Sequence, residues 1–154
     1  MPGTEVVFTS ERSAAEMIER LIRQTKNTFD AALYRFNSRR LADALADAKR
    51  RGVRVRMVVD RNKYDESQAT RDLLADHRFP FRLARGRGGN SSKMHHKFAL
   101  LDEKTVITGS YNWTFASEEE NYENLLILRD PEVVRTYRPE FESLWAQASA
   151  VERN

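Results

Sequence analysis

Hydrophobic positions recur along this chain with two alternating periods. Val53, Val55, Met57 and Val59 repeat at every second residue, which is the period of a β-strand. Within residues 11–26 the apolar positions are three and four residues apart, so they form one stripe on a helix. The two periods follow each other along the chain, and this order predicts an α/β fold.

Capping residues, a glycine and a proline mark where the expected helices begin, end or bend. Ser10 and Ser38 stand where helix N-caps are expected, Gly52 stands at a helix end, and Pro139 should kink the last helix. The expected helices cover residues 11–26, 38–51, 67–76 and 131–148. The expected strands cover residues 5–9, 28–36, 53–60, 79–85, 96–102, 105–110 and 123–130. We therefore predict one domain over residues 1–154, with a central mixed β-sheet flanked by helices on both faces.

Composition narrows the class of protein. Hydrophobic residues make up 40% of the 154 residues and charged residues 32%, which is typical of a soluble globular protein. No apolar run approaches the roughly 20 residues of a membrane span, and the N-terminus lacks a signal-peptide core. We expect no stable membrane association, and either a cytoplasmic protein or an exported one whose signal has been removed. The absence of cysteine excludes disulfides, thiol nucleophiles and cysteine zinc sites.

Positive charge is concentrated in part of the chain. The formal net charge is +3, yet no acidic residue occurs between His77 and Leu101. This segment contains the glycine-rich, polar stretch 86–93, which predicts a flexible loop, and a second basic stretch covers residues 39–56. Local positive fields attract polyanions, so nucleic acid and an anionic membrane surface are candidate partners. The alternative for either stretch is a solvated basic surface.

The basic segment leads into two adjacent histidines. On a strand, His95 and Lys97 share one face, while His96 points to the opposite, apolar face. Ser110 and Asn112 end the next expected strand and could converge on the same place. Imidazole, ammonium, hydroxyl and amide groups together suit an anionic oxygen centre such as phosphate. The alternative is a pair of core histidines beside a surface lysine.

The spacing of these residues resembles that of a known family. The pattern His95-x-Lys97-x₄-Asp102-x₆-Gly109-Ser110-x-Asn112 is similar to the phospholipase D superfamily signature at every fixed position. Residues 34–61 and 121–128 also resemble this family, and the single copy of the motif resembles the small one-motif bacterial nucleases and the Zucchini-type proteins. The resemblance implies the phospholipase D-like layered fold and a metal-independent phosphodiesterase that needs no cofactor.

The resemblance also implies a role for each motif residue. His95 would attack phosphorus and form a phosphohistidine, which water would then cleave. Glu123 matches the family acid that holds the other ring nitrogen of the nucleophile. Asp102 is part of the motif, and we interpret it as a structural turn residue. The groups that would hold the phosphate oxygens and stabilise the transition state are Lys97, Ser110 and Asn112.

One motif supplies only part of what this reaction needs. In-line displacement puts the nucleophile and the leaving group on opposite sides of phosphorus, so one histidine cannot both attack and protonate the leaving oxygen. His77 and His96 are poor candidates, because one lies in an unrelated segment and the other faces away. His95 of a second subunit could supply the acid across a two-fold axis. We therefore predict a homodimer with one composite site.

The basic residues favour nucleic acid as the substrate. They could follow a phosphate backbone while Trp113 or Phe115 stacks on bases, which predicts a sequence-nonspecific endonuclease that favours single-stranded DNA or RNA. The alternatives are a cardiolipin hydrolase of the same superfamily, a non-catalytic nucleic-acid-binding module, and the catalytic domain of a larger protein. The expected substrate-binding residues are Arg35, Arg82, Arg85, Arg87, Lys93 and Trp113.

Overall fold

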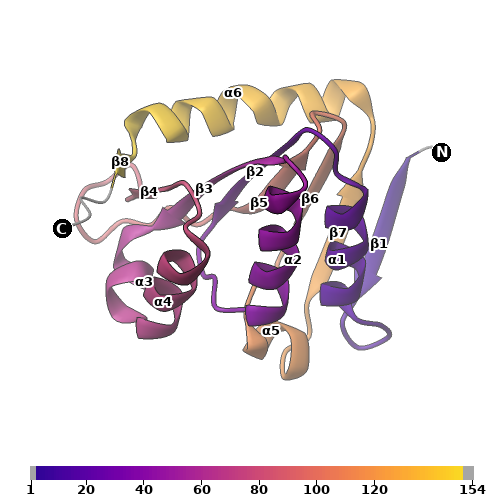
Figure 1. The fold of residues 1–154 in the computed structure, drawn as a ribbon, viewed down its shortest axis with the longest axis horizontal. Coiled ribbons are helices and arrows are strands. Elements are labelled where there is room, and N and C mark those ends of the chain that lie inside the picture. Colours follow the sequence, from indigo (N-terminus) through magenta and orange to yellow (C-terminus); the bar gives the residue numbers. More distant parts are fainter. Residues whose placement is uncertain (1–2, 151–154) are drawn as a thin grey trace.

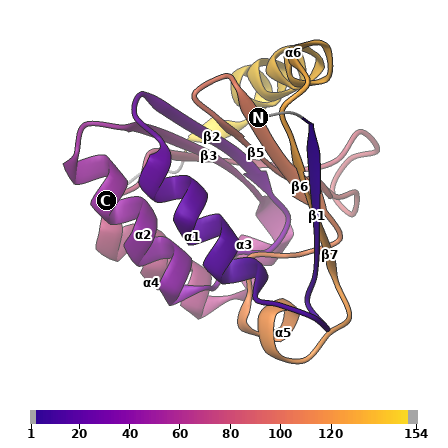
Figure 2. The ribbon, with the colours of Figure 1, turned by 90° about the vertical axis from the view of Figure 1, so that its right-hand side faces the viewer.

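Helices cover both faces of one mixed β-sheet (Figures 1 and 2). The computed structural model describes residues 3–150. The predicted α/β class, with a central mixed sheet between helical layers, is confirmed. The predicted single domain also includes residues 1–2 and 151–154, which lie outside the described residues, and its bounds stay a prediction.

The strands in the described residues form one sheet in the order β1-β7-β6-β5-β2-β3-β4-β8. Neighbours β2, β3 and β4 are parallel, whereas the remaining pairs are antiparallel. Parallel neighbours need a crossover, and helices provide it between β2 and β3 and between β3 and β4. The strand bounds are β1 (Thr4–Phe8), β2 (Thr28–Leu33), β3 (Arg54–Asp60), β4 (Phe81–Ala84), β5 (Lys97–Leu101), β6 (Thr105–Gly109), β7 (Asn124–Leu128) and β8 (Ser149–Ala150).

The helices divide between the two faces of the sheet. Figure 2 shows α1 to α4 on one side of the strands and α6 on the other, while the short α5 lies at one end of the sheet. The larger hydrophobic core fills the space under α1 to α4, and a smaller one lies under α6. The helix bounds are α1 (Ala14–Gln24), α2 (Arg39–Arg50), α3 (Arg61–Glu66), α4 (Gln68–His77), α5 (Phe115–Glu119) and α6 (Pro131–Gln147).

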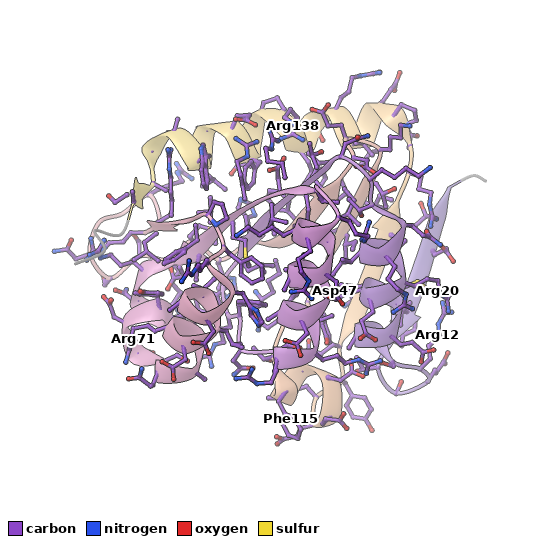
Figure 3. The ribbon with its side chains drawn as sticks, viewed as in Figure 1. Arg12, Arg20, Asp47, Arg71, Phe115 and Arg138 are labelled. Carbon is purple, nitrogen blue, oxygen red and sulfur yellow. The ribbon has the colours of Figure 1, made fainter. Side chains whose placement is uncertain are left out.

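Ion pairs as well as apolar contacts hold α6 on the sheet. Asp30 on β2 is fully buried, and its carboxylate accepts hydrogen bonds from Arg56 at 2.8 Å and from Arg138 at 2.7 Å. Arg138 extends from α6 (Figure 3), and it also pairs with Glu142 one turn along the helix. A buried carboxylate is costly unless it is paired, so these contacts tie the position of α6 to strands β2 and β3.

Several boundaries differ from the sequence-based expectation. Ser13, rather than Ser10, caps α1, whereas Ser38 caps α2 as predicted. Helices α3 and α5 and strand β8 were not predicted, because each is too short to show a hydrophobic period. Helix α6 continues through Pro139 without ending there.

Candidate active site

The residues of the motif other than Asp102 come together at one end of the sheet. Because β5 and β6 are antiparallel, the start of β5 lies beside the end of β6, which brings His95 close to Ser110 and Asn112. β2 is antiparallel to β5, and Leu33 pairs with Lys97, so Tyr34 and Arg35 follow at this same end. β3 is parallel to β2, and it ends here at Asp60.

His95 and Lys97 share one face, as the period of the strand predicts. The Lys97 Nζ atom lies 3.4 Å from Nδ1 and 3.5 Å from Nε2 of His95, and 3.2 Å from the His95 carbonyl oxygen. Beneath them lies the buried ring of Tyr34, whose centroid is 4.5 Å from that of the imidazole. Sequence reasoning missed Tyr34, although the strand alternation and its position directly after β2 were a usable signal.

The surroundings of His95 favour its neutral form. Partial burial lowers the pKa of His95, and the charges of Lys97, Lys93 and Arg35 lower it further, against the opposing charge of Asp60. Burial also lowers the pKa of Lys97, and the charge of Arg35 adds to this effect, while Glu123 opposes it. A neutral imidazole keeps a ring lone pair, which is what a nitrogen nucleophile requires.

Glu123 contacts the motif through serine rather than through His95. Its two carboxylate oxygens accept hydrogen bonds from Ser110 Oγ at 2.7 Å and from Ser117 Oγ at 2.8 Å. The expected hydrogen bond from the His95 ring to Glu123 is not formed in the described structure, where both ring nitrogens lie near Lys97 Nζ. Glu123 therefore holds Ser110 in this structure, and its expected role toward the His95 ring stays a prediction.

Asn112 and Gly109 hold the turn that follows β6. The Asn112 backbone N–H donates to Ser117 Oγ, and within the described residues its buried Oδ1 has no hydrogen-bond partner. Gly109 has a φ of +136°, and a Cβ there would lie 2.4 Å from the Asn124 carbonyl oxygen on β7. Only glycine fits this close approach, so the glycine of the motif is explained by backbone packing.

Asp102 lies at the opposite end of β5, away from His95 and Lys97. Its carboxylate accepts backbone hydrogen bonds from Lys26, Asn27 and Thr28 at 2.9, 2.7 and 3.0 Å, and so it caps the start of β2. Including Asp102 among the catalytic residues is therefore wrong, and the interpretation as a structural turn residue agrees with the geometry. Burial would raise the pKa of Asp102, but the three backbone donors outweigh it and hold the pKa below its usual range.

This contact predicts a pH-dependent stability. Replacing Asp102 with asparagine, which also tolerates the φ of 54°, should lower the free energy of unfolding by about 1–3 kcal/mol at pH 7. A depressed pKa contributes stability above the unfolded-state value of about 3.9 and loses it as pH falls through the folded-state pKa. The difference between the two proteins, measured by urea unfolding, should therefore shrink as pH falls through the folded-state pKa of Asp102. The exposed Asp76→Asn is the control, and an equal loss there would contradict the assignment.

Two expected substrate-binding residues are structural instead. Trp113 is 1% exposed and packs against Phe29 in the core, with ring centroids 5.8 Å apart, so it cannot stack on a base. The Arg82 guanidinium lies 4.1 Å from the ring centroid of Trp145 and donates to the Trp145 carbonyl oxygen at 2.7 Å. Both predictions failed because only the tertiary structure shows what these side chains pack against.

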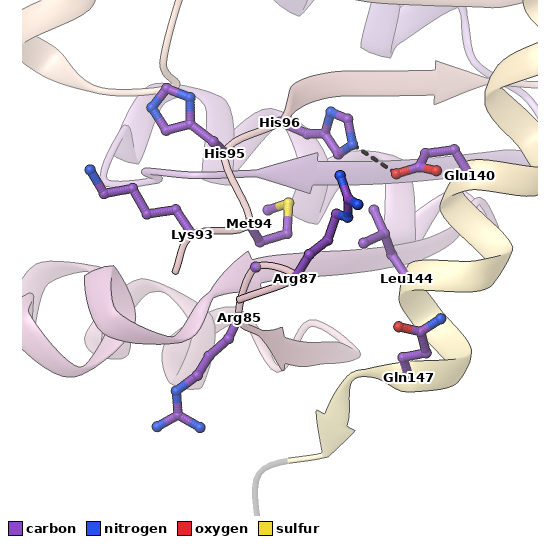
Figure 4. Close-up of a pocket in the computed structure, with 10 residues that line it drawn as sticks. Arg85, Arg87, Lys93, Met94, His95, His96, Glu140, Leu144 and Gln147 are labelled. Carbon is purple, nitrogen blue, oxygen red and sulfur yellow. Dashed lines mark hydrogen bonds and ion pairs between the residues drawn. The ribbon is translucent and has the colours of Figure 1, made fainter. Parts of the chain in front are cut away.

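A basic pocket opens beside His95 on the side of α6. Arg85, Arg87 and Lys93 line it together with His95 and His96 (Figure 4). These three cations belong to the expected substrate-binding set, and the structure brings them to the candidate site. The wall on the side of α6 consists of Glu140, Leu144 and Gln147.

His96 points to the other face of the sheet, as expected, but it is not enclosed there. Its Nε2 atom lies 2.8 Å from Glu140 Oε2 on α6 (Figure 4), and its ring packs edge-on against Phe98. The His96 side chain is 45% exposed. His96 therefore connects the motif to α6, and it does not contact Lys97 as His95 does.

Asp60 positions the segment before His95. It is fully buried, and its Oδ1 accepts the Met94 backbone N–H at 2.9 Å while its Oδ2 accepts the Lys63 backbone N–H at 3.0 Å. One carboxylate thus joins the end of β3, the start of α3 and the residue next to His95. Sequence reasoning missed this role, although an aspartate directly before a helix is a usual N-cap signal.

Neither a metal-binding group nor a membrane-spanning helix occurs in the described residues. The described residues contain no group of three or more histidine, aspartate or glutamate side chains arranged to hold a metal ion. None of the helices within residues 3–150 combines the length and apolar character that a bilayer crossing requires.

This chain is similar to one protein family and to curated proteins of known name. Residues 18–145 match the family described as "Cardiolipin synthase, PLD-like domain". The chain is 36% identical over 155 residues to the human mitochondrial cardiolipin hydrolase, and the match covers 95% of this chain and 60% of that protein. The mouse protein of the same name is 35% identical to this chain, and the match again covers 60% of that protein. The chain therefore spans about three fifths of the length of these relatives.

Solved structures agree with the fold. Nuc, a phospholipase D family member from Salmonella typhimurium, superposes with a TM-score of 0.88 at 26% identity, covering 99% of this chain and 100% of its own. NucT from Helicobacter pylori gives a TM-score of 0.83 at 21% identity, with 97% and 100% covered, and this similarity concerns the fold alone.

Proposed function

The chain belongs to the family of phospholipase D-like domains, and on that premise we propose that it is a metal-independent phosphodiesterase that cleaves the nucleic-acid backbone. The observation that carries the proposal is the position of His95. Its ring lies against Lys97, its pKa is lowered toward the neutral form, and it forms part of a pocket lined by Arg85, Arg87 and Lys93. A nucleophile surrounded by cations suits a phosphodiester, whose two free oxygens share a negative charge.

The chemistry proceeds in two displacements. A ring nitrogen of His95 attacks phosphorus, the bond from phosphorus to the leaving oxygen breaks, and that oxygen takes a proton from an acid on the far side. Lys97 and the Asn112 amide bind the non-bridging oxygens and stabilise the added charge of the transition state. Water then attacks phosphorus and gives a proton back to the acid of the first step, the bond from phosphorus to the His95 nitrogen breaks, and the phosphate product is released. Ser110, held by Glu123, orders the turn that carries Asn112.

The acid on the far side is His95 of a second copy of this chain, so one of the two histidines starts neutral as the nucleophile and its twin starts protonated. The surface beside the site supports such a partner, because α6 leaves part of its face of the sheet uncovered. Val6 and Phe8 on β1 are 42% and 49% exposed, and Leu126 on β7 pairs with Val6. Phe8 pairs with Asn124, directly after Glu123, so this apolar strip reaches the candidate site. An exposed apolar patch of this kind is typical of a protein interface.

The lining of the pocket favours nucleic acid over lipid. Apart from Gly86, Met94 and Leu144, the residues that line it carry charged or polar groups, which suit a charged substrate. A group of cations instead suits a phosphate backbone, which would be bound without reading the bases.

Cardiolipin hydrolysis is the second candidate function. It is favoured by the names of the human and mouse relatives, which are mitochondrial cardiolipin hydrolases. The exposed aromatic residues Phe115, at the start of α5, and Tyr122, after its end, could enter a lipid surface, and Phe115 projects outward from α5 (Figure 3). The acidic residues 118–120 between them would be repelled by an anionic membrane.

A substrate panel in excess EDTA tests both candidates. Labelled single-stranded DNA, double-stranded DNA, RNA and cardiolipin vesicles are incubated separately with the protein, and products are followed by gel electrophoresis or lipid chromatography. We expect cleavage of nucleic acid, with single strands cut faster than duplex. Conversion of cardiolipin alone would replace the first candidate with the second. Activity that appears only after magnesium is added would show that the mechanism is wrong.

A further inference from the structure

A second group of cations surrounds Tyr34, outside the basic pocket. The Lys97 and Lys63 Nζ atoms lie 5.4 and 5.6 Å from the centroid of the Tyr34 ring, and Arg35 Cζ lies 5.6 Å from it. We call Arg35, Lys63 and Lys97 the Tyr34 cluster. The His95 ring packs against the same ring at an interplanar angle of 58°, so the cluster is directly beside the proposed nucleophile. Neither Arg35 nor Lys63 lines the basic pocket on the side of α6.

The fold holds this cluster in place. Tyr34 is 6% exposed and provides a buried aromatic surface on which cations bind favourably. Lys63 lies in the first turn of α3, and its backbone N–H is bonded to the same Asp60 carboxylate that holds Met94. The position of Lys63 is therefore coupled to that of His95 through one buried side chain.

Counter-charge in the cluster is scarce. Lys63 pairs with Glu66 at 3.0 Å, but the Glu66 side chain is 63% exposed, and such an exposed pair contributes about 0–1 kcal/mol. The charge of Arg35 lowers the pKa of both His95 and Lys97, which is the sign of cations held together against repulsion. A bound anion would relieve that repulsion, and Glu66 is weak enough to be displaced by it.

The reacting phosphate leaves Arg35 and Lys63 unused. Lys97 and Asn112 are already assigned to its oxygens, and in the described residues no hydrogen bond joins Lys63 to His95 or Lys97. We propose that Arg35 and Lys63 form a second phosphate subsite beside the reacting phosphate, so that the preferred substrates carry two phosphodiesters joined by a short linker. This proposal rests on the proposed function, because it takes His95 as the place of reaction. Neighbouring nucleotides have this chemistry, and so do the two phosphates of cardiolipin.

The test compares substrates with one and with two phosphodiesters. The variants Arg35→Gln, Lys63→Gln and their combination are assayed with a single-stranded oligonucleotide and with bis(4-nitrophenyl) phosphate, which has one phosphodiester only. We expect the ratio of kcat/KM for the oligonucleotide to that for the small ester to fall about tenfold in the double variant. Lys26→Gln, an exposed lysine near the opposite end of the sheet, is the matched control and should leave the ratio unchanged.

A lipid arm identifies the source of the second phosphate. The same variants are assayed with cardiolipin and with phosphatidylglycerol, which has one phosphodiester, in identical detergent micelles. The second ratio is kcat/KM for cardiolipin divided by that for phosphatidylglycerol. If only this ratio falls, the subsite is assigned to the lipid. If only the ratio for the oligonucleotide over the small ester falls, the subsite is assigned to nucleic acid. Unchanged ratios in both pairs overturn the subsite.

Binding separates this inference from the proposed function. If the unaltered protein hydrolyses none of these substrates, the proposed function fails, and the subsite is judged by oligonucleotide binding in a His95→Asn background. Each cation that contacts a phosphate contributes about 0.7 to the slope of log affinity against log salt for a single strand. The slope measured for the double variant should therefore be smaller in magnitude by about 1.4, and an unchanged slope contradicts the subsite.

Discussion

Replacing His95 with asparagine is expected to lower kcat/KM for a single-stranded oligonucleotide in EDTA by about 10⁴-fold or more. In the proposed mechanism the substitution removes the nucleophile and, through the second copy, the acid that would protonate the leaving oxygen. Asparagine cannot form the phosphohistidine, and it cannot donate a proton at neutral pH. The side chain lies at the surface of the site, so the fold should be retained, and this is checked by circular dichroism and thermal unfolding.

The other two histidines provide matched controls for this experiment. His77→Asn makes the same change on α4, where the ring lies 3.2 Å from Asp43, and it should retain the activity of the unaltered protein. His96→Asn breaks the contact with Glu140 but leaves His95 and Lys97 together, so the loss should stay within about tenfold. A larger loss in His96→Asn than in His95→Asn would contradict the assignment of the nucleophile.

Mixed dimers are expected to be inactive if the site is shared. His95→Asn and unaltered chains are unfolded together in equal amounts and refolded, so that subunits combine at random. With one composite site per dimer, only dimers of two unaltered chains retain both histidines, and the activity falls to about a quarter of that of the same total amount of unaltered protein. Independent sites would instead retain about half. Quantification at several mixing ratios distinguishes a square dependence from a linear one.

The proposed interface can be tested in the same preparation. Phe8→Asp places a charge in the uncovered apolar strip, and it should convert the protein to a monomer by light scattering and abolish activity together with dimerisation. Phe115→Asp introduces the same charge on the exposed surface of α5 and is the control. A protein that is monomeric and active without any substitution would exclude the shared site.

The sequence predicted the parts of the structure that local periodicity controls. The strand that carries Val55, Met57 and Val59 and the helix capped by Ser38 were predictable because their apolar spacing and caps lie within a few residues. The same local rule separated His95 from His96, since neighbouring positions at the start of a strand point to opposite faces. The motif also indicated the family, which the match to residues 18–145 confirms.

Roles that depend on distant partners were not predictable. Trp113 and Phe115 are both aromatic and lie near the motif, yet Trp113 is 1% exposed and Phe115 is 66% exposed. No local pattern distinguishes them, because burial depends on contact with β2. Arg82 and Arg85 differ in the same way, since Trp145 of α6 engages only the first of them through a ring contact and a hydrogen bond.

The sequence alone thus determined the family, the layered α/β class and the identity of His95 and Lys97 as neighbours on one face, because spacing along a strand decides which side chains point the same way. Tertiary structure decided the rest. It brought the start of β2 within hydrogen-bond distance of Asp102, at the far end of β5, and it brought the Glu123 carboxylate within hydrogen-bond distance of Ser110. It also placed Tyr34, Asp60 and Lys63 around His95, since the ends of β2 and β3 meet there only after the sheet has formed.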